Sequence, residues 1–355
     1  MDKAKALYYI ENSFLSSLLA DEDITDISFN GKDIYYVSNT KGRMKSEIVI
    51  EHQMAKDFLR QIANIAEKQF SFTSPVLDIT VGRYRINATH QSIGRIADEG
   101  VVTFCIRIAS GEIRINRESD FFTKDIVILL REILRNRCSI AIGGTTSSGK
   151  TELQKYLLLN MRENERVIII DNVLELDQVR NDYLDLTCWQ VDDNSSYSSA
   201  SSLIRNALRN NPDWLILAEA RGEEMVDVLN SAMTGLPIIT TIHSLDAISL
   251  PHRMGRMMMK SQQKIDFKEA LIDIYYHFHF YIYLTKEETS NGVKRYLSEI
   301  NFVNNDGKVT NLFSRNGDEC KYGQITKEII KVLNIKKDSL LYQTSFMRKG
   351  DAKYE

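Results

Sequence analysis

The stretch GTTSSGKT, residues 144–151, decides the fold because it satisfies the phosphate-binding pattern G-x-x-x-x-G-K-[ST] in full. The apolar run CSIAIG precedes it as a strand, and TELQKYLLLNMR follows it as a helix. Its glycines let several backbone N–H groups point at a phosphate, and the helix adds its positive amino-terminal end. Lys150 should reach the β- and γ-phosphates, and the Thr151 hydroxyl should bind Mg²⁺. The residues expected to bind a nucleoside triphosphate are Gly144, Thr145, Thr146, Ser147, Ser148, Gly149, Lys150 and Thr151.

The sequence around this stretch has the pattern of an α/β domain. Strand-like apolar runs, separated by helical segments, recur at 138–142, 167–170, 214–218 and 238–242. Buried strands that alternate with helices predict a mainly parallel sheet with both faces covered. Beyond about residue 286 the pattern weakens, although it still predicts a strand at 297–303 and a helix at 325–333.

The amino-terminal part has a different pattern, typical of a smaller α+β domain. Helical spacing covers 6–19 and 53–67, and short β-rich runs lie at 24–29, 33–37, 76–81, 84–89 and 101–108. Asn30-Gly31 predicts a tight turn between the first two of these strands. We therefore expect an α+β domain at 1–108, a polar linker at 109–122 and an α/β domain at 123–355, extended from about residue 286.

Composition excludes several classes of protein. The 355 residues are 43% hydrophobic and 26% charged, which is the balance of a globular chain and not of a disordered or collagen-like one. Lys plus Arg number 45 against 48 Asp plus Glu, so the basic excess of a constitutive nucleic-acid binder is missing. The four cysteines form no C-x-x-C pair, and the apolar runs fall far short of the roughly 20 residues that span a bilayer. We expect a cytoplasmic protein that does not cross the membrane.

Three polar residues follow predicted strands and are candidates for catalysis. A P-loop enzyme needs an acid at the end of a neighbouring strand to orient Mg²⁺ and the attacking water. Glu219 follows the strand WLILA, and Asp171 follows VIII. His243 ends the run PIITTIH, although a lone histidine is as often a structural residue. Lone carboxylates are also common, so neither acid is convincing by itself. The prediction depends on the position that both share, directly after an apolar strand.

Four motifs in order resemble those of the hexameric ATPases that drive type II and type IV secretion and type IV pili. They are GGTTSSGKT, IIIDNVLEL, LRNNPDWLILAEARGEE and MTGLPIITTIHS, which are similar to the family's Walker A, aspartate box, Walker B and histidine box. In the amino-terminal half, ITDISFNG, SPVLDITVG, RYRIN and FCIRIAS resemble the conjugation-type and CpaF-like branches. The resemblance covers about residues 20–260 and implies a RecA-like P-loop ATPase domain behind a PAS-like amino-terminal domain.

The resemblance also implies roles for individual residues. Glu219 would polarise water through the metal site, and Arg221 matches the family's E-x-R-G pattern. His243 would sense the γ-phosphate or couple subunits. Arg85 and Arg107 match arginines that approach the nucleotide in this family, although surface ion pairs explain them equally well. Thr151 and Glu219 would thus be the metal-site residues, and ATP and Mg²⁺ the cofactors.

The sequence departs from the family at several positions. The aspartate box usually begins Glu-Asp-Thr, whereas this chain has Asp171-Asn172-Val173. If a catalytic water is held here, the shorter Asp171 displaces it by about 1 Å, which can slow turnover about 10²-fold. Asn211 and Trp214 stand where the family often has arginine. We expect fewer cationic groups near the subunit boundary as a result.

Missing motifs narrow the branch. No paired C-x-x-C zinc motif and no retraction motif is found, which favours the conjugation and type IV secretion branch or a CpaF-like enzyme. The resemblance implies a homo-hexamer at the cytoplasmic face of the inner membrane, whose partners are secretion or pilus platform proteins and which does not require nucleic acid. Two alternatives stay open: a nucleotide-gated assembly module with little hydrolysis, and a RecA-like DNA motor.

Overall fold

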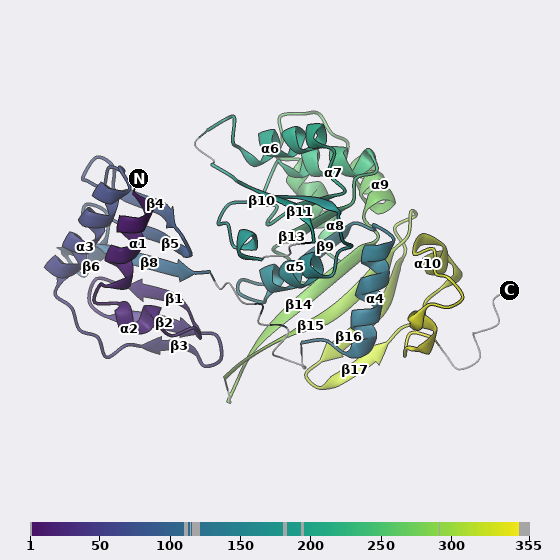
Figure 1. The fold of residues 1–355 in the computed structure, drawn as a ribbon, viewed down its shortest axis with the longest axis horizontal. Helices are drawn as coiled ribbons and strands as arrows, with labels where there is room; N and C mark the ends of the chain where they lie inside the picture. The colour runs from purple at the N-terminus through teal and green to yellow at the C-terminus, as the bar shows by residue number, and fades with distance from the viewer. Residues whose placement is uncertain are drawn as a thin grey trace. The chain divides into compact units, whose positions relative to one another are not determined.

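The structure, a computed structural model, divides the chain into two compact units (Figure 1). The first comprises Met1–Gly111 and Glu287–Lys294, and the second comprises Glu112–Lys286 and Arg295–Glu355. The described residues are 2–109, 113, 115, 121–179, 183–192, 195–290 and 292–347. Most of the predicted linker 109–122 lies outside them. No helix among the described residues is long and apolar enough to cross a membrane.

The first unit is a six-stranded antiparallel sheet with the order β3-β2-β1-β8-β5-β4. A separate pair joins β6 to β7. The elements are α1 Lys3–Glu11, α2 Ser16–Leu19, β1 Ile24–Phe29, β2 Ile34–Ser38, β3 Gly42–Lys45, α3 His52–Ile65, β4 Val76–Val81, β5 Tyr84–Thr89, β6 Arg95–Ile96, β7 Glu99–Gly100 and β8 Thr103–Ile108. Alternate strand residues such as Ile27 and Phe104 are buried in a core shared with Phe58 of α3. Period-two alternation thus places one apolar face of the sheet under the helices.

Most predicted elements of this unit are confirmed, and one is wrong. The strands at 24–29, 76–81 and 84–89 are found at those residues. The single helix predicted at 6–19 is broken between α1 and α2, because Asn12 Nδ2 donates to the Tyr8 carbonyl and Ser13 Oγ donates to the Ile10 carbonyl. Short polar side chains that satisfy the last carbonyls end a helix.

The second unit contains a nine-stranded mixed sheet with the order β11-β10-β12-β13-β9-β14-β15-β16-β17. The pairs from β11 to β14 are parallel, whereas β15, β16 and β17 pair antiparallel. The elements are α4 Lys124–Arg135, β9 Ile140–Gly144, α5 Lys150–Leu159, β10 Arg166–Asp171, β11 Asp185–Gln190, α6 Ala200–Ala207, β12 Trp214–Leu217, α7 Met225–Met233, β13 Ile238–Ile242, α8 Leu250–Met258, α9 Phe267–His277, β14 Phe280–Thr289, β15 Gly292–Val303, β16 Val309–Asn316, β17 Glu319–Tyr322 and α10 Lys327–Val332. Short 3₁₀ helices lie at Leu176–Gln178, Leu208–Asn210 and Leu340–Gln343.

Both faces of this sheet are covered, as the continuous apolar strands predict. In β9, Ile140 and Ile142 face a core that includes residues of α4, α5 and α10. The intervening Ala141 faces a second core with residues of α6, α7, α8 and α9. The α/β fold class is therefore confirmed, with an antiparallel-sheet unit followed by a mixed-sheet unit (Figure 1).

Two parts of the second unit differ from the prediction. The alternating stretch 277–281 reads as a strand, but His277 ends α9 and β14 begins at Phe280. Where the pattern weakens beyond residue 286, the structure has a long hairpin, β14–β15. The tip of this hairpin, Glu287–Lys294, belongs to the first unit. There the Val293 N–H donates to the Thr40 carbonyl at 2.6 Å. The sequence does not indicate this return of the chain.

Candidate nucleotide-binding site

Four adjacent strands bring the sequence motifs to one edge of the sheet. In the order β10-β12-β13-β9, the strands are followed by Asp171, Glu219, His243 and the loop 144–151. The carboxyl ends of parallel strands meet at the same edge, which is where open α/β sheets bind ligands. Motifs separated by up to a hundred residues therefore converge.

The loop 144–151 has the backbone of a phosphate cradle. Gly149 has φ of 98° and Ser147 has φ of 60°, so the chain enters the left-handed region twice within three residues. A Cβ on Gly144 would lie 2.3 Å from Ser148 Oγ, which only glycine avoids. Thr145, Thr146 and Ser147 are exposed, whereas Ser148 Oγ is buried and has no hydrogen-bond partner among the residues that the structure describes. Exposed peptides above an unsatisfied buried hydroxyl suit a ligand rich in acceptor oxygens.

Lys150 begins α5 and folds back over this loop. Its Nζ donates to the carbonyls of Gly144 at 3.0 Å and Thr145 at 2.8 Å, and it lies 3.4 Å from His243 Nδ1. The ammonium group is thus held at the mouth of the cradle by weak, exchangeable acceptors. A phosphate, with its charged oxygens, would compete well for these donors.

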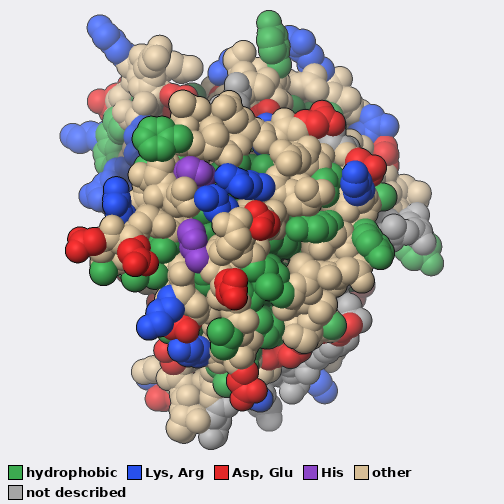
Figure 2. Space-filling view, turned by 90° about the vertical axis from the view of Figure 1, so that its left-hand side faces the viewer, with side chains coloured by type: hydrophobic (Ala, Val, Ile, Leu, Met, Phe, Trp, Pro, Cys, Tyr) green, Lys and Arg blue, Asp and Glu red, His purple; other side chains and the backbone are tan. Residues whose placement is uncertain are grey.

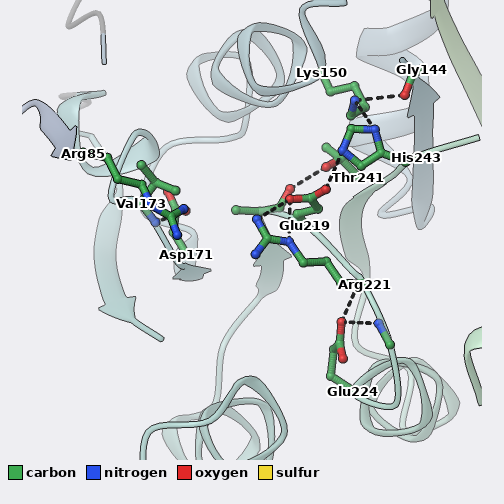
Figure 3. Close-up of polar contacts among 12 residues, drawn as sticks. Arg85, Gly144, Lys150, Asp171, Val173, Glu219, Arg221, Glu224, Thr241 and His243 are labelled. Atoms are coloured by element: carbon green, nitrogen blue, oxygen red, sulfur yellow. Dashed lines mark hydrogen bonds and ion pairs between the residues drawn. The ribbon is translucent and has the colours of Figure 1, made fainter. Parts of the chain in front are cut away.

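Glu219 is the centre of the polar contacts at this edge. Its Oε1 lies 2.8 Å from His243 Nε2, and its Oε2 accepts from Arg221 Nε at 2.8 Å and Nη2 at 2.6 Å (Figure 3). Figure 3 shows Lys150, His243, Glu219 and Arg221 joined by successive contacts. Arg221 and His243 are about half exposed, so both partners can move without disturbing the core.

The turn after Glu219 is fixed by Glu224. Its Oε1 accepts from the backbone N–H of Gly222 at 2.8 Å and also from that of Arg221 (Figure 3). On the other side, Thr241 Oγ1 donates to the Ala218 carbonyl at 2.6 Å and so ties β13 to the end of β12. These bonds orient the main chain that carries Glu219 and Arg221.

Asp171 has a structural task that the sequence did not indicate. Its Oδ1 accepts from the Val173 N–H at 2.9 Å, and its Oδ2 accepts from Glu175 at 2.9 Å and Leu176 at 3.3 Å. Only 3% of the residue is exposed. Three backbone donors use most of the roughly four lone-pair positions of a carboxylate. Asp171 therefore caps the turn into the 3₁₀ helix, and its expected role in holding a catalytic water stays a prediction.

Trp214 is a core residue of the second unit. It is fully buried, and its Nε1 donates to Glu165 at 3.1 Å. Asn211 adopts φ of 50°, a left-handed conformation that asparagine tolerates better than arginine does. These two departures from the family pattern therefore have local structural reasons.

Arg85 and Arg107 lie side by side in the first unit, in register on β5 and β8. Arg85 pairs with Asp78 at 3.1 Å, and Arg107 pairs with Asp26 at 3.3 Å. Both lie on the sheet face opposite the helices, because their neighbours in the strands are buried. Their approach to a nucleotide remains a prediction.

Three residues at the site escaped the sequence analysis. Arg295 of β15 donates from Nε to the Ser147 carbonyl at 2.7 Å. Phe121 packs beside Gly149, where a Cβ would lie 3.2 Å from its ring, and its carbonyl accepts from the Leu297 N–H. Glu299 accepts from the Ala247 N–H at 3.2 Å, in the loop after His243. No motif marks them, and of the three only Glu299 lies within the strand predicted at 297–303.

Two pKa shifts are relevant to this region. Burial raises the pKa of the Glu299 carboxyl; the bond from Ala247 opposes this, and the charge of Asp246 adds to it. Burial also lowers the pKa of His279, whose Nδ1 lies 3.0 Å from the Val303 carbonyl and whose ring stacks on Phe302. His279 is therefore a packed residue between α9 and β14, and His277 is the last residue of α9.

Comparison with known proteins shows which protein family this sequence resembles. Residues 102–276 match the model of the family described as Type II/IV secretion system protein. An uncharacterized protein of Bacillus anthracis is 28% identical over 293 residues, which are 78% of this chain and 64% of that protein. Type IV secretion system protein VirB11 of Bartonella quintana is 29% identical over 143 residues, 40% of each chain. The chain thus spans less than two thirds of the length of these relatives.

A solved structure supports the fold. The ATPase DotB of Yersinia pseudotuberculosis superposes with a TM-score of 0.63 at 14% identity, over 96% of this chain and 84% of that one. At this level of identity the likeness concerns the fold alone. Together with the motifs assembled at the sheet edge, the family match indicates that residues 102–276 resemble the Type II/IV secretion system protein family.

Proposed function

We propose that this protein is an ATP-hydrolysing motor that powers assembly or substrate transport by a type IV secretion, conjugation or related pilus apparatus. The observation that carries the proposal is the chain of contacts from Lys150 through His243 to Glu219, beside a phosphate cradle. A cradle that only bound nucleotide would not need a carboxylate held at this position by a histidine and an arginine.

The residues of the cradle fit ATP and Mg²⁺. The backbone N–H groups of 145–149 and the Lys150 ammonium would hold the phosphates, and Thr151 and Glu219 would hold the metal ion. When bound, Mg²⁺ neutralises charge that develops on the phosphate oxygens. The buried Ser148 hydroxyl has no hydrogen-bond partner within the described part of the chain and can donate to a phosphate oxygen or a bound water.

Glu219 is the proposed acceptor of the proton from the attacking water. Each of its oxygens already accepts a hydrogen bond, so proton transfer requires His243 or Arg221 to give way. His243 is suited to this exchange because it also contacts Lys150, which binds phosphate. His243 would thereby sense the γ-phosphate, and Arg221 would return to Glu219 after hydrolysis. In this scheme Asp171 shapes the neighbouring turn and takes no proton.

Assembly and location extend the same proposal. The family resemblance supports a homo-hexamer at the cytoplasmic face of the membrane, in contact with platform proteins of the apparatus. Nucleic acid is not required. On the face drawn in Figure 2, Lys and Arg side chains are interspersed with Asp and Glu, so the visible described residues form no continuous basic stripe. The formal net charge of −3 also gives little support to the alternative of a RecA-like DNA motor.

The decisive experiment is steady-state ATP hydrolysis by the purified protein at concentrations that allow a ring to form. Lys150→Ala should abolish turnover, and Lys321→Ala, which removes an exposed lysine from β17, should leave it unchanged. Stimulation by added DNA would favour the DNA motor. Sedimentation analysis would show whether the subunits assemble into a ring.

The capped Asp171 favours one second candidate, an assembly module that binds ATP with little hydrolysis. Here the contacts of Glu219 with Arg221 and His243 would persist after nucleotide binds. Tight ATP binding by the wild-type protein and by Lys321→Ala, with no turnover in either, would establish this candidate and reject the motor.

A further inference from the structure

Gln154 joins the helix that follows the phosphate loop to the strand that leads to Glu219. It lies in α5, one turn after Lys150, and its side chain is fully buried. Its Nε2 donates to the Leu217 carbonyl at 3.2 Å. Leu217 is the last residue of β12 and precedes Glu219 by two residues. One buried amide therefore connects two elements of the candidate site within the second unit.

The orientation of this amide follows from its partner. A backbone carbonyl only accepts hydrogen bonds, so the nitrogen of Gln154, and not its oxygen, must face Leu217. The Oε1 atom is buried and has no hydrogen-bond partner among the residues that the structure describes. A buried oxygen without a donor lowers stability, and an apolar side chain of the same shape would avoid this cost. Packing alone therefore does not account for a glutamine at this position.

The segment 217–220 is held from three directions. Besides the bond from Gln154, the Ala218 N–H donates to the Ile170 carbonyl of β10 at 2.9 Å. The Ala218 carbonyl accepts from Thr241 Oγ1 of β13 at 2.6 Å. These two strand partners fix the segment within the sheet. Gln154 comes from a helix that packs on one face of the sheet, so its bond fixes the segment relative to α5.

Apolar packing also holds α5 against β12, but it leaves the helix some freedom to slide. Leu153 and Leu157 of α5 share a core with Ile216 of β12. Hydrophobic contacts are non-directional and allow small sliding of packed helices, whereas a hydrogen bond has a preferred length and angle. The bond from Gln154 to Leu217 is thus the contact that specifies where α5 stands relative to the end of β12.

The spacing of α5 and β12 matters because the proposed metal-site residues lie one on each side of it. Thr151 lies in α5, three residues before Gln154, and Glu219 follows β12. Mg²⁺ requires near-octahedral geometry with oxygen ligands at about 2.0–2.1 Å. Side chains that support such a site must keep its ligands within about 0.5 Å of that geometry.

We propose that Gln154 is a positioning residue that holds Thr151 and Glu219 at the separation that Mg²⁺ requires, and so couples Mg²⁺ binding to nucleotide binding. The inference rests on the proposed function, because it concerns the same metal-site residues. Gln154 touches neither the metal ion nor the nucleotide in this scheme. The phosphate contacts of the loop and of Lys150 do not depend on it, so its loss should weaken Mg²⁺ binding and spare nucleotide binding in the absence of metal.

Two substitutions on α5 test the proposal. Gln154→Met keeps the length of the side chain but removes the bond to the Leu217 carbonyl. Leu153→Met is the control, because it places the same side chain one residue earlier, at a position that is also fully buried, and changes only packing. A difference between the two variants is therefore due to the amide. Gln154→Leu removes the amide independently and should behave as Gln154→Met does.

The measurements use a fluorescent ADP derivative and the full chain. The dissociation constant in excess EDTA reports the phosphate contacts, and the Mg²⁺ concentration that gives half of the affinity gain reports the metal site. Gln154→Met should keep the first value and raise the second about tenfold, the effect of losing a group that orients a metal ligand. In steady-state ATP hydrolysis, the Mg²⁺ concentration for half-maximal rate should rise by a similar factor. Leu153→Met should match wild type in each measurement.

An unchanged Mg²⁺ midpoint in Gln154→Met and Gln154→Leu, or an equal increase in Leu153→Met, would overturn the inference and leave the motor intact. Weaker binding in EDTA would also overturn it, because the amide would then support the phosphate contacts themselves. Nucleotide binding without turnover in the wild type would reject the motor instead, and the Mg²⁺ midpoints would still decide the role of Gln154. Circular dichroism of each variant checks that it has folded.

Discussion

The two edges of the parallel strands both carry charged residues, but they use them differently. At the amino edge, Glu165 is buried and accepts from Trp214 Nε1, from Arg137 at 3.2 Å and from the Arg162 N–H at 3.1 Å. At the carboxyl edge, Glu219 is held by Arg221 and His243, both about half exposed. Glu165 is thus held by a buried indole and a backbone N–H as well as by the partly exposed Arg137, whereas both partners of Glu219 are half-exposed side chains.

The amino edge is a network that joins several strands. Asp213 accepts from Arg137 at 2.8 Å and from the Arg166 N–H at 2.9 Å, and Arg166 pairs with Asp185 at 2.6 Å. These contacts tie the starts of β10, β11 and β12 together. Charge at this edge joins neighbouring strands, whereas we propose that charge at the opposite edge exchanges its partners when a ligand binds.

The largest expected effect concerns the carboxyl edge. Glu219→Gln removes the proposed proton acceptor, so kcat should fall about 10²–10³-fold, or about 3–4 kcal/mol in the activation barrier. Glu223→Gln, an exposed neighbour, is the control. The denaturant midpoint should stay within error of wild type, because Glu219 does not support the core. A large loss of stability in Glu219→Gln would show that the carboxylate at the carboxyl edge, like Glu165 at the amino edge, is needed for folding stability.

The second prediction tests the amino edge. Glu165→Ala leaves the buried Trp214 N–H and Arg137 without their acceptor, which should lower the free energy of unfolding by about 3 kcal/mol. Glu163→Ala, two residues away and exposed, should change it little. Nucleotide affinity measured well below the melting temperature should be unaffected. Reduced nucleotide affinity in a folded Glu165→Ala protein would contradict the inference that the amino edge contributes to stability and not to nucleotide binding.

A third variant concerns Asp171, which lies at the carboxyl edge but behaves like the amino edge. Asp171→Ala removes the acceptor of three backbone N–H groups and should cost about 2 kcal/mol of stability. Asp306→Ala, an exposed control, should not. Asp171→Glu should also be less stable, because the longer side chain misplaces the cap. Faster ATP turnover in Asp171→Glu would restore the catalytic role expected from the sequence.

The smallest effect is a pH dependence. Burial raises the folded-state pKa of Glu299 above its ordinary value of 4.5, so the ionised form is disfavoured by folding. Its contribution to stability is fully present below that value and is lost as pH rises through the folded pKa. Glu299→Gln should therefore match wild type in acid and become more stable towards neutrality, by less than about 1 kcal/mol for a half-buried group.

Denaturant midpoints measured from pH 4 to 7 check this difference. Glu319→Gln, which is 70% exposed, serves as the control and should track wild type throughout. A Glu299→Gln protein that becomes less stable than wild type as pH rises would show that the ionised carboxylate is needed by the Ala247 N–H.

The sequence predicted the convergence of the site because each motif ends a strand. Strand ends are encoded locally, by apolar runs followed by Glu219, His243 or the glycine-rich loop, and parallel pairing brings them together. Side-chain partners are not encoded locally. Nothing in the segment around Trp214 reveals that Glu165 lies beside it, and nothing in β15 reveals that Arg295 meets Ser147.

The errors in the predicted elements have the same origin. Asn12 and Ser13 end α1 through bonds to its carbonyls, although the apolar spacing continues past them. The alternation at 277–281 mixes the last residue of α9 with the first of β14. The tip of the β14–β15 hairpin is short, polar and remote in sequence from its partner Thr40, so no periodicity could assign it to the first unit.

The two tryptophans of the chain lie at opposite edges of this sheet. Trp214 opens β12 and is buried beside Glu165, whereas Trp189, partly exposed on β11, pairs with Ile170, the residue before Asp171. Intrinsic fluorescence therefore contains two separable signals. Emission from Trp214 reports the integrity of the fold, and emission from Trp189 reports events at the edge where ligand would bind, so the chain carries its own pair of optical probes.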